Sequence, residues 1–334
     1  MSYKIGEELA TFYITPTSNE LHINEFIKNH NLFGAKDFKI EKVSDLETTI
    51  DYIHQLSGTP LLLQQDQYGG AQGDVPNFIK NYYKKSNNAI ENQKAKTMID
   101  IIKSYYPNAT QMDIINIAES FAPNGCVYMA FANTFVAHMG SIENGADIFK
   151  RKIGYDLIVT DGTNKSYNVE ALALNINLNR CKKMNLSMEE TIKNNNGVSY
   201  QSTPTDIVSF FEDRGIKIKE QRGIMLESEE KSIMPSLLAE IASNPNSMYI
   251  LRAKGFDLES VSQSAFDNND KALESSVVDK NVRKNIGGHG MLITGLTESG
   301  DFIVSSWKEK FIFKVGEMLK NKGYAFIDSV RYEE

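Results

Sequence analysis

The stretch Asn124-Gly125-Cys126-Val-Tyr-Met-Ala-Phe-Ala-Asn-Thr-Phe-Val-Ala-His138 decides the fold of this chain. From Cys126 to His138 it is apolar on nearly all faces, and a helix that is apolar all round is buried in a protein core. Asn124 and Gly125 break the preceding chain, and Gly140 supplies a stop signal after the run. The pattern predicts a buried helix whose first residue is Cys126.

The start of a buried helix suits a nucleophilic cysteine. A thiol attacks as its thiolate, and a free cysteine with a pKa near about 8.5 is mostly protonated at neutral pH. The helix macrodipole favours the anion, and the unpaired N–H groups of the first turn can hold an oxyanion. We therefore expect Cys126 to be a nucleophile with a lowered pKa. Its own backbone N–H and the Asn124 amide are the candidates for the oxyanion site, and an inert core cysteine is the competing interpretation.

The partner that such a thiol needs is an imidazole, which pairs with the thiolate and later protonates the leaving group. His289 is the best candidate because Gly287, Gly288 and Gly290 surround it and leave its ring accessible at the mouth of a strand. We expect the Cys126 and His289 side chains to lie within roughly 4 Å of each other. A histidine in an ordinary glycine-rich loop is the alternative. His138, inside the apolar helix, is expected to be a core histidine.

The remaining cysteine and histidines give no further site. The chain has 2 cysteines, too few for a disulfide framework, and Cys181 lies among Asn, Arg and Lys residues with no reactive context. The histidines form no pair at metal-binding spacing, and no cysteine pair accompanies them. We expect neither a metal nor a cofactor.

The region around His289 resembles the histidine hairpin of papain-like cysteine peptidases. It is also similar to the bacteriocin-processing peptidases, which have the same core. The matching residues are Gly288-His289-Gly-Met-Leu-Ile-Thr-Gly295 and Gly300-Asp301-Phe-Ile-Val-Ser305-Ser306-Trp307. In these families an Asn or Asp about sixteen residues after the His orients the imidazole. The resemblance implies Ser305 in that role, with Asp301 as the alternative, and it implies that Trp307 shields the pair from water unless it is a plain core aromatic.

The resemblance extends to the cysteine loop and covers about residues 111–334. Asn124-Gly125-Cys126 looks like the cysteine loop of bacterial papain-like enzymes. The family also carries a Gln six residues before the Cys, and that position is Ser120 here. This departure is why Asn124 is considered for the oxyanion site.

The order of elements predicts an α+β protein with a papain-like core and an extra amino-terminal region. Thr110 and Asp113 indicate a capped helix ending near residue 120, and strands are expected at 216–219, 248–253, 291–296, 302–306, 310–313 and 324–328. Further helices are expected at 45–56, 205–214 and 232–243, a strand at 60–64, and a polar loop over 257–283. Residues 69–74 resemble a phosphate loop only loosely and are expected to form a plain loop. We divide the chain into an accessory region, 1–105, and a catalytic domain, 106–334.

Composition excludes several classes of function. The chain has 334 residues, is 41% hydrophobic and carries a net charge of -7, so it can bury a core but has no general attraction for nucleic acid. No apolar stretch approaches the roughly 20 residues of a membrane span. Without a recognisable secretory signal, we expect a cytoplasmic protein or one secreted by a signal-independent route. Its rich use of Lys, Asn and Ile suggests a low-GC bacterial genome and, by analogy, a bacterial effector.

These observations predict a cysteine-dependent hydrolase that cleaves peptide or isopeptide bonds through an acyl-enzyme, with a protein or peptide as substrate. The same machinery serves papain-fold deamidases, transglutaminases and acyltransferases, and nothing in the sequence selects the acyl acceptor. A catalytically decayed papain-like binding protein is the other alternative, because Ser305 and Ser120 depart from the family pattern.

Overall fold

The computed structural model describes residues 70–139, 142–195, 204–226, 248–261, 278–296, 302–307 and 309–333, together with three short earlier strands. These strands, β1 (Ser2–Ile5), β2 (Glu8–Thr11) and β3 (Phe38–Glu41), form an antiparallel sheet in the order β2-β1-β3. The elements expected at 45–56, 60–64 and 232–243 lie outside the described residues.

A group of helices carries the central part of the chain. The helix after Thr110 begins with a capping box in which Thr110 and Asp113 satisfy each other's backbone N–H groups, as predicted. The helices are α3 (Asp74–Tyr83), α4 (Ala89–Tyr105), α5 (Gln111–Phe121), α6 (Cys126–Met139), α7 (Ile142–Ile148), a π-helical turn at Phe149–Ile153, α8 (Val169–Lys183), α9 (Met188–Asn195), α10 (Pro204–Glu212) and α13 (Val315–Lys320).

The carboxyl-terminal part of the chain forms an antiparallel sheet in the order β6-β13-β7-β10-β11-β12-β8-β9. The predicted hairpin is present as β10 and β11, and the combination of helices with antiparallel sheet confirms the α+β class. The strands are β6 (Lys217–Leu226), β7 (Met248–Lys254), β8 (Phe256–Val261), β9 (Val278–Ile286), β10 (His289–Leu296), β11 (Phe302–Ser306), β12 (Glu309–Phe313) and β13 (Tyr324–Glu333), and a separate hairpin pairs β4 (Ile158–Asp161) with β5 (Asn164–Tyr167).

The prediction of a loop over residues 257–283 is wrong at both ends, where the strands β8 and β9 form. Their charged and polar residues hide the alternation that identifies a strand, so the pairing of β8 with β9 and β12 determines the conformation.

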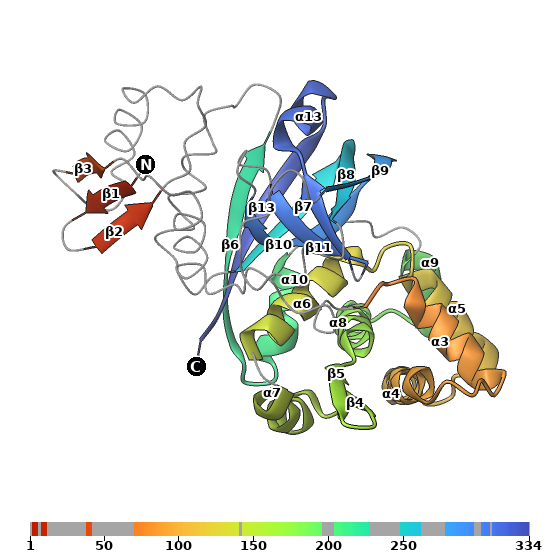
Figure 1. Cartoon of the computed structure of the whole chain (residues 1–334). Helices are drawn as coiled ribbons and strands as arrows, with labels where there is room; N and C mark the ends of the chain where they lie inside the picture. The colour runs from red at the N-terminus through yellow and green to blue at the C-terminus, as the bar shows by residue number, and fades with distance from the viewer. Residues whose placement is uncertain are drawn as a thin grey trace.

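The predicted buried helix, α6, lies at the centre of the molecule. Its residues are buried from Cys126 to Met139 with the exception of His138, which is exposed and stacks on Tyr332. The expectation of a core histidine at position 138 is therefore wrong, because this last turn of the helix reaches the surface. In Figure 1, α6 and α10 lie next to the sheet and α8 packs against them, and α6 contacts β10 and β7.

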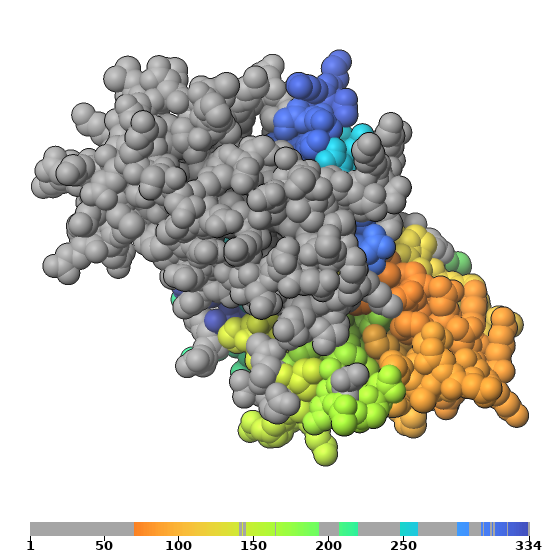
Figure 2. Space-filling view, viewed as in Figure 1, coloured from red at the N-terminus to blue at the C-terminus, as the bar shows by residue number. Residues whose placement is uncertain are grey.

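The hydrophobic core continues across residue 105. Val75 and Ile79 of α3 and Met98 of α4 belong to the same cluster of buried side chains as Phe131 of α6 and Leu292 of β10. Figure 2 shows α3 and α4, in orange, next to the green β4–β5 hairpin, and α4 also contacts α8. The part of the chain from residue 75 onward thus packs against the elements that carry Cys126 and His289. Among the described residues, no helix has the length and apolar character needed to cross a membrane.

Candidate active site

Cys126 is the first residue of α6, as the sequence predicted. The first hydrogen bond of the helix runs from Met129 N–H to the Gly125 carbonyl, 2.9 Å away, so the N–H groups of Cys126 and Val127 lie ahead of the helical ladder. The residue is 5% exposed. A thiol at this position has backbone donors on one side and apolar packing on the other.

Burial raises the pKa of the Cys126 thiol above its ordinary value, although hydrogen bonds from the backbone of Gly290, Val127 and Cys126 itself act in the opposite direction. The expected lowering is therefore not found in this arrangement. The physical reason is that removing the thiolate from water costs more than these three backbone donors return. Burial therefore favours the neutral thiol over the thiolate in this arrangement.

The hydrogen bond from Gly290 also locates the sulfur relative to the sheet. Gly290 follows His289 at the start of β10, so the Cys126 sulfur lies beside the peptide that joins these two residues. The close approach requires glycine: a Cβ atom on Gly290 would lie 2.8 Å from Val127 Cγ2 and 3.1 Å from Val127 Cα. The tertiary structure thus brings the Cys126 and His289 segments together, and the sulfur-to-imidazole distance stays a prediction.

His289 is buried and held by two residues from the end of β11. Its Nε2 atom lies 2.5 Å from Ser306 Oγ. The imidazole also stacks on the Trp307 indole, with a centroid distance of 4.1 Å and an interplanar angle of 16°. Both contacts fix the ring orientation, and they assign Nε2 to Ser306.

The expectation that Ser305 orients the imidazole is wrong by one residue. Ser305 is paired with Leu292 of β10, and Leu292 belongs to the core that contains α6, so Ser305 shares that face of the sheet. The register of β10 and β11 shifts between Ile293 and Gly295, which places one extra residue in β10. Because of this bulge, the residue of β11 that contacts the imidazole comes seventeen residues after His289 and not sixteen. The hydroxyl that contacts the ring is therefore that of Ser306. Asp301, the alternative, lies outside the described residues.

Trp307 adopts a backbone conformation that is unusual for its residue type. Its φ angle is +48°, in the left-handed region, within the tight connection between Ser306 of β11 and Glu309 of β12. A bulky residue in this region is strained, and such strain persists only when surrounding contacts enforce it. Stacking on His289 and the edge contact with Phe311, at 5.9 Å, are those contacts.

One residue that the sequence did not single out lies next to the residue before Cys126. A Cβ atom on Gly125 would lie 2.8 Å from the Cβ of Gln72, so the Gln72 side chain begins against the residue that precedes Cys126. Ser120, at the position where the resembling family has its Gln, donates its hydroxyl to the Ile117 carbonyl within α5. Asn124 lies in the turn before Gly125, with its N–H donating to the Phe121 carbonyl, 3.1 Å away. The role of its amide remains a prediction.

No local signal marks Gln72 as functional. It lies in the segment 69–74, which the sequence predicts to be a plain loop, and three helices separate it from Cys126 along the chain. Only the fold brings Gln72 next to Gly125 and makes it a candidate.

The other candidates are separate from this site. Cys181 is buried in α8, and burial raises the pKa of its thiol although Thr191 and Arg180 oppose this. Within the described part of the chain, no group of three His, Cys, Asp or Glu residues could hold a metal ion.

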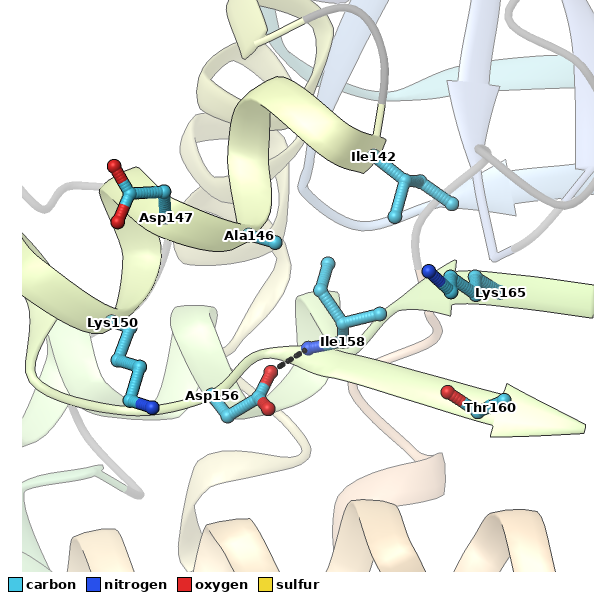
Figure 3. Close-up of a pocket in the computed structure, with 8 residues that line it drawn as sticks. All are labelled: Ile142, Ala146, Asp147, Lys150, Asp156, Ile158, Thr160 and Lys165. Atoms are coloured by element: carbon cyan, nitrogen blue, oxygen red, sulfur yellow. Dashed lines mark hydrogen bonds between the residues drawn. The ribbon is translucent and has the colours of Figure 1, made fainter.

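A pocket of about 370 Å³ lies between α7 and the β4–β5 hairpin (Figure 3). Ile142, Ala146 and Ile158 form its apolar part. Two lysines at its rim, Lys150 and Lys165, are matched in number by two aspartates, so their charges balance and select no charged ligand. None of the residues that line it belongs to the Cys126–His289 site.

Comparison with known proteins adds no further constraint to this picture. No protein-family model matches the chain, and no curated protein matches its sequence. The functional interpretation therefore rests on the geometry of Cys126, His289, Ser306, Trp307 and Gln72.

Proposed function

We propose that this chain is a cysteine-dependent hydrolase with a papain-like arrangement, in which Cys126 attacks the carbonyl of a peptide or isopeptide bond. The observation that carries the proposal is the hydrogen bond between the Gly290 backbone and the Cys126 sulfur. It joins the helix start that carries the thiol to the strand start that carries His289. The contacts of His289 with Ser306 and Trp307 also support the proposal, because each restricts the orientation that a catalytic imidazole needs.

The proton transfer in this proposal follows from the tautomer of His289. When Nε2 carries the ring proton, it donates to Ser306 Oγ, and Nδ1 carries the lone pair that takes the thiol proton. Because burial raises the pKa of Cys126, the proton leaves the sulfur as an acyl donor arrives rather than in the resting state. The new thiolate then forms a bond to the carbonyl carbon.

The rest of the reaction uses the start of α6. The carbonyl oxygen becomes an oxyanion, which the Cys126 N–H and the Gln72 carboxamide stabilise. The intermediate collapses as the C–N bond breaks, and the His289 imidazolium protonates the departing amine. Water then attacks the thioester, with His289 as base, and releases the acid and the free thiol.

A decayed binding protein is the second candidate, because Cys126 is only 5% exposed and its pKa is raised. In that case the His289 contacts serve stability alone. The two candidates differ in one property, which is whether the thiol accepts an acyl group.

The test uses p-nitrophenyl acetate, a small acyl donor that needs no specific binding site. We expect a burst of p-nitrophenolate in which the Cys126 thioester is recovered by peptide mass mapping. Cys126→Ala and His289→Gln should abolish the burst, and Cys181→Ala should retain it. An undiminished burst in Cys126→Ala, or no burst in the native chain, would reject the proposal. Acetate as the final product, against transfer to an added primary amine, distinguishes hydrolase from transferase.

A further inference from the structure

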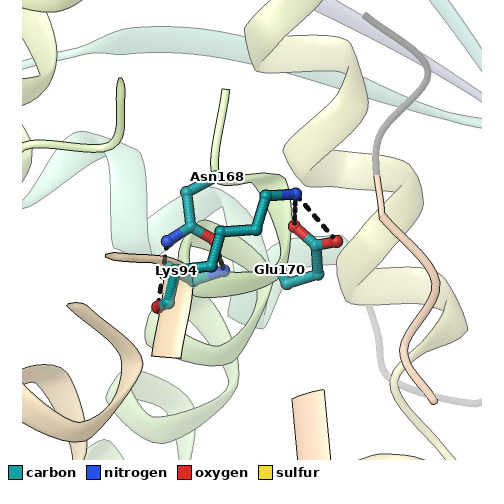
Figure 4. Close-up of polar contacts among 4 residues, drawn as sticks. Lys94, Asn168 and Glu170 are labelled. Carbon is teal, nitrogen blue, oxygen red and sulfur yellow. Dashed lines mark hydrogen bonds and ion pairs between the residues drawn. The ribbon is translucent and has the colours of Figure 1, made fainter. Parts of the chain in front are cut away.

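A buried ion pair that the proposed reaction does not use lies beside the Gln72 segment. Glu170, in the first turn of α8, is fully buried, and the Lys94 ammonium of α4 lies 3.2 Å and 3.0 Å from its two carboxylate oxygens. The N-cap residue Asn168 accepts a hydrogen bond from Ala171 N–H and donates one to the Lys94 carbonyl, at 3.2 Å each. Figure 4 shows the Lys94, Asn168 and Glu170 contacts together, and they fasten α4 to α8.

Such a pair calls for an explanation other than stability. Taking two charges out of water costs about as much as their attraction returns, and an apolar pair of similar size often stabilises a core better. The residues that Glu170 contacts indicate what the charges do. A Cβ atom on Gly70 would lie 1.9 Å from both Cδ and Oε1 of Glu170, so the Gly70 backbone rests directly on the carboxylate.

Gly70 is two residues before Gln72, and the intervening backbone is tightly turned. Asp74 N–H donates to the Ala71 carbonyl at 2.9 Å, and Val75 N–H donates to the Gln72 carbonyl at 3.4 Å. The segment 70–73 is thus held at one end by Glu170 and at the other by the contact of Gln72 with Gly125. Lys94 also lies 5.7 Å from the centre of the Phe78 ring, which ties the following helix α3 to the same point.

We propose that Glu170, held in place by Lys94, is a positioning residue for the Gln72 carboxamide. The carboxylate sets the backbone at Gly70, the turn carries that placement to Gln72, and Gln72 then faces the reaction centre at the start of α6. This inference rests on the proposed function of Cys126. According to this inference, the Lys94–Glu170 pair affects the stabilisation of the oxyanion. It does not affect the intrinsic reactivity of the thiol.

Two probes separate these effects. Acylation by p-nitrophenyl acetate passes through an oxyanion, whereas alkylation by iodoacetamide displaces iodide from carbon and forms none. Glu170→Gln keeps the shape of the side chain but loses its charge. We expect it to slow the acylation burst about tenfold, since small displacements of catalytic groups have effects of this size or larger, and to leave the alkylation rate of Cys126 unchanged. Asp100→Asn is the matched control, because Asp100 pairs with Lys96 on the exposed face of α4.

A double-mutant cycle tests whether Glu170 acts through Gln72. In a Gln72→Ala background, Glu170→Gln should have no further effect on the ratio of acylation to alkylation. An unchanged ratio in Glu170→Gln, or an equal loss in both backgrounds, overturns the inference while the burst of the native chain keeps the proposed function intact. No Cys126-dependent burst in the native chain overturns both. If Glu170→Gln does not fold, Glu170→Asp, which keeps the charge and withdraws it from Gly70, is judged by the same criteria.

Discussion

Ser306 Oγ lies 2.5 Å from His289 Nε2, at the end of the strand that returns beside β10. This contact gives the imidazole a hydroxyl as its partner, whereas the families that the sequence resembles use an amide or carboxylate for this role. A hydroxyl can accept a hydrogen bond from the ring N–H and so hold the ring in place. It adds no negative charge to stabilise an imidazolium. The proposed reaction therefore depends on orientation by Ser306 more than on electrostatic support.

Substitution of the two adjacent serines separates orientation from simple burial. Ser306→Ala removes the contact to Nε2 and should slow acylation of Cys126 roughly tenfold or more, part of the 10²–10⁴ that acid–base catalysis contributes. Ser305→Ala is the control, because Ser305 is also buried but lies on the other face of β11. Burst rates with p-nitrophenyl acetate measure both. A larger loss in Ser305→Ala would contradict the assignment.

Fluorescence reports directly on the stacked pair, because Trp307 is the single tryptophan of the chain. Because the His289 ring covers one face of the indole, its removal should change the environment of Trp307, and we expect His289→Gln to change the intensity or the wavelength of the emission. His138→Gln is the control and should leave the emission unchanged, since His138 stacks on Tyr332 instead. Emission that is the same in His289→Gln as in the native chain would argue against the contact.

The junction of α6 with β10 should not tolerate a methyl group at Gly290. A Cβ atom there would lie 3.2 Å from Val127 N and 3.1 Å from Val127 Cα, and backbone cannot give way as a side chain can. We expect Gly290→Ala to lower the free energy of unfolding by about 1–3 kcal/mol, as overpacking does. Gly316→Ala, where nothing lies within 4 Å, should be neutral or slightly stabilising. Urea unfolding measures both, and equal midpoints would refute the close packing.

The buried thiol should react slowly at neutral pH. Burial raises the pKa of Cys126, so the thiolate fraction at pH 7 is below that of a free cysteine, and the rate of iodoacetamide alkylation should keep rising above about pH 8.5. The same shift makes the folded state hold a proton that the unfolded state releases, so this contribution to stability is lost as pH rises through the folded pKa. Mass mapping of native protein between pH 6 and 10 measures the rate. A plateau below pH 7 would show a thiolate already stabilised at rest.

The order of modification of the two cysteines is a related expectation. Burial raises the pKa of Cys181 as well, and we expect Cys126 to be alkylated first, because three backbone groups hydrogen-bond to its sulfur. Faster modification of Cys181 would count against Cys126 as the nucleophile.

Several elements could be predicted from the sequence because their signals are local. The apolar run after Gly125 predicted α6 and its first residue, Thr110 and Asp113 predicted the start of α5, and the hairpin of β10 and β11 followed from two apolar runs on either side of a turn. Each of these depends on neighbours within a few residues, which is the range over which periodicity and capping act. Cys126 and His289 could be singled out because the chemistry of each needs one residue type in a recognisable local setting.

Which residues contact one another depends on the tertiary structure. The bulge in β10 moved the contact with His289 from Ser305 to Ser306, since one extra residue in a strand reverses the face of everything that follows. The packing of α3, α4 and α8 brought Gln72 to Gly125 and Glu170 to Gly70. Burial of Cys126 reversed the expected direction of its pKa shift, because desolvation depends on the whole surrounding core and not on the helix start alone.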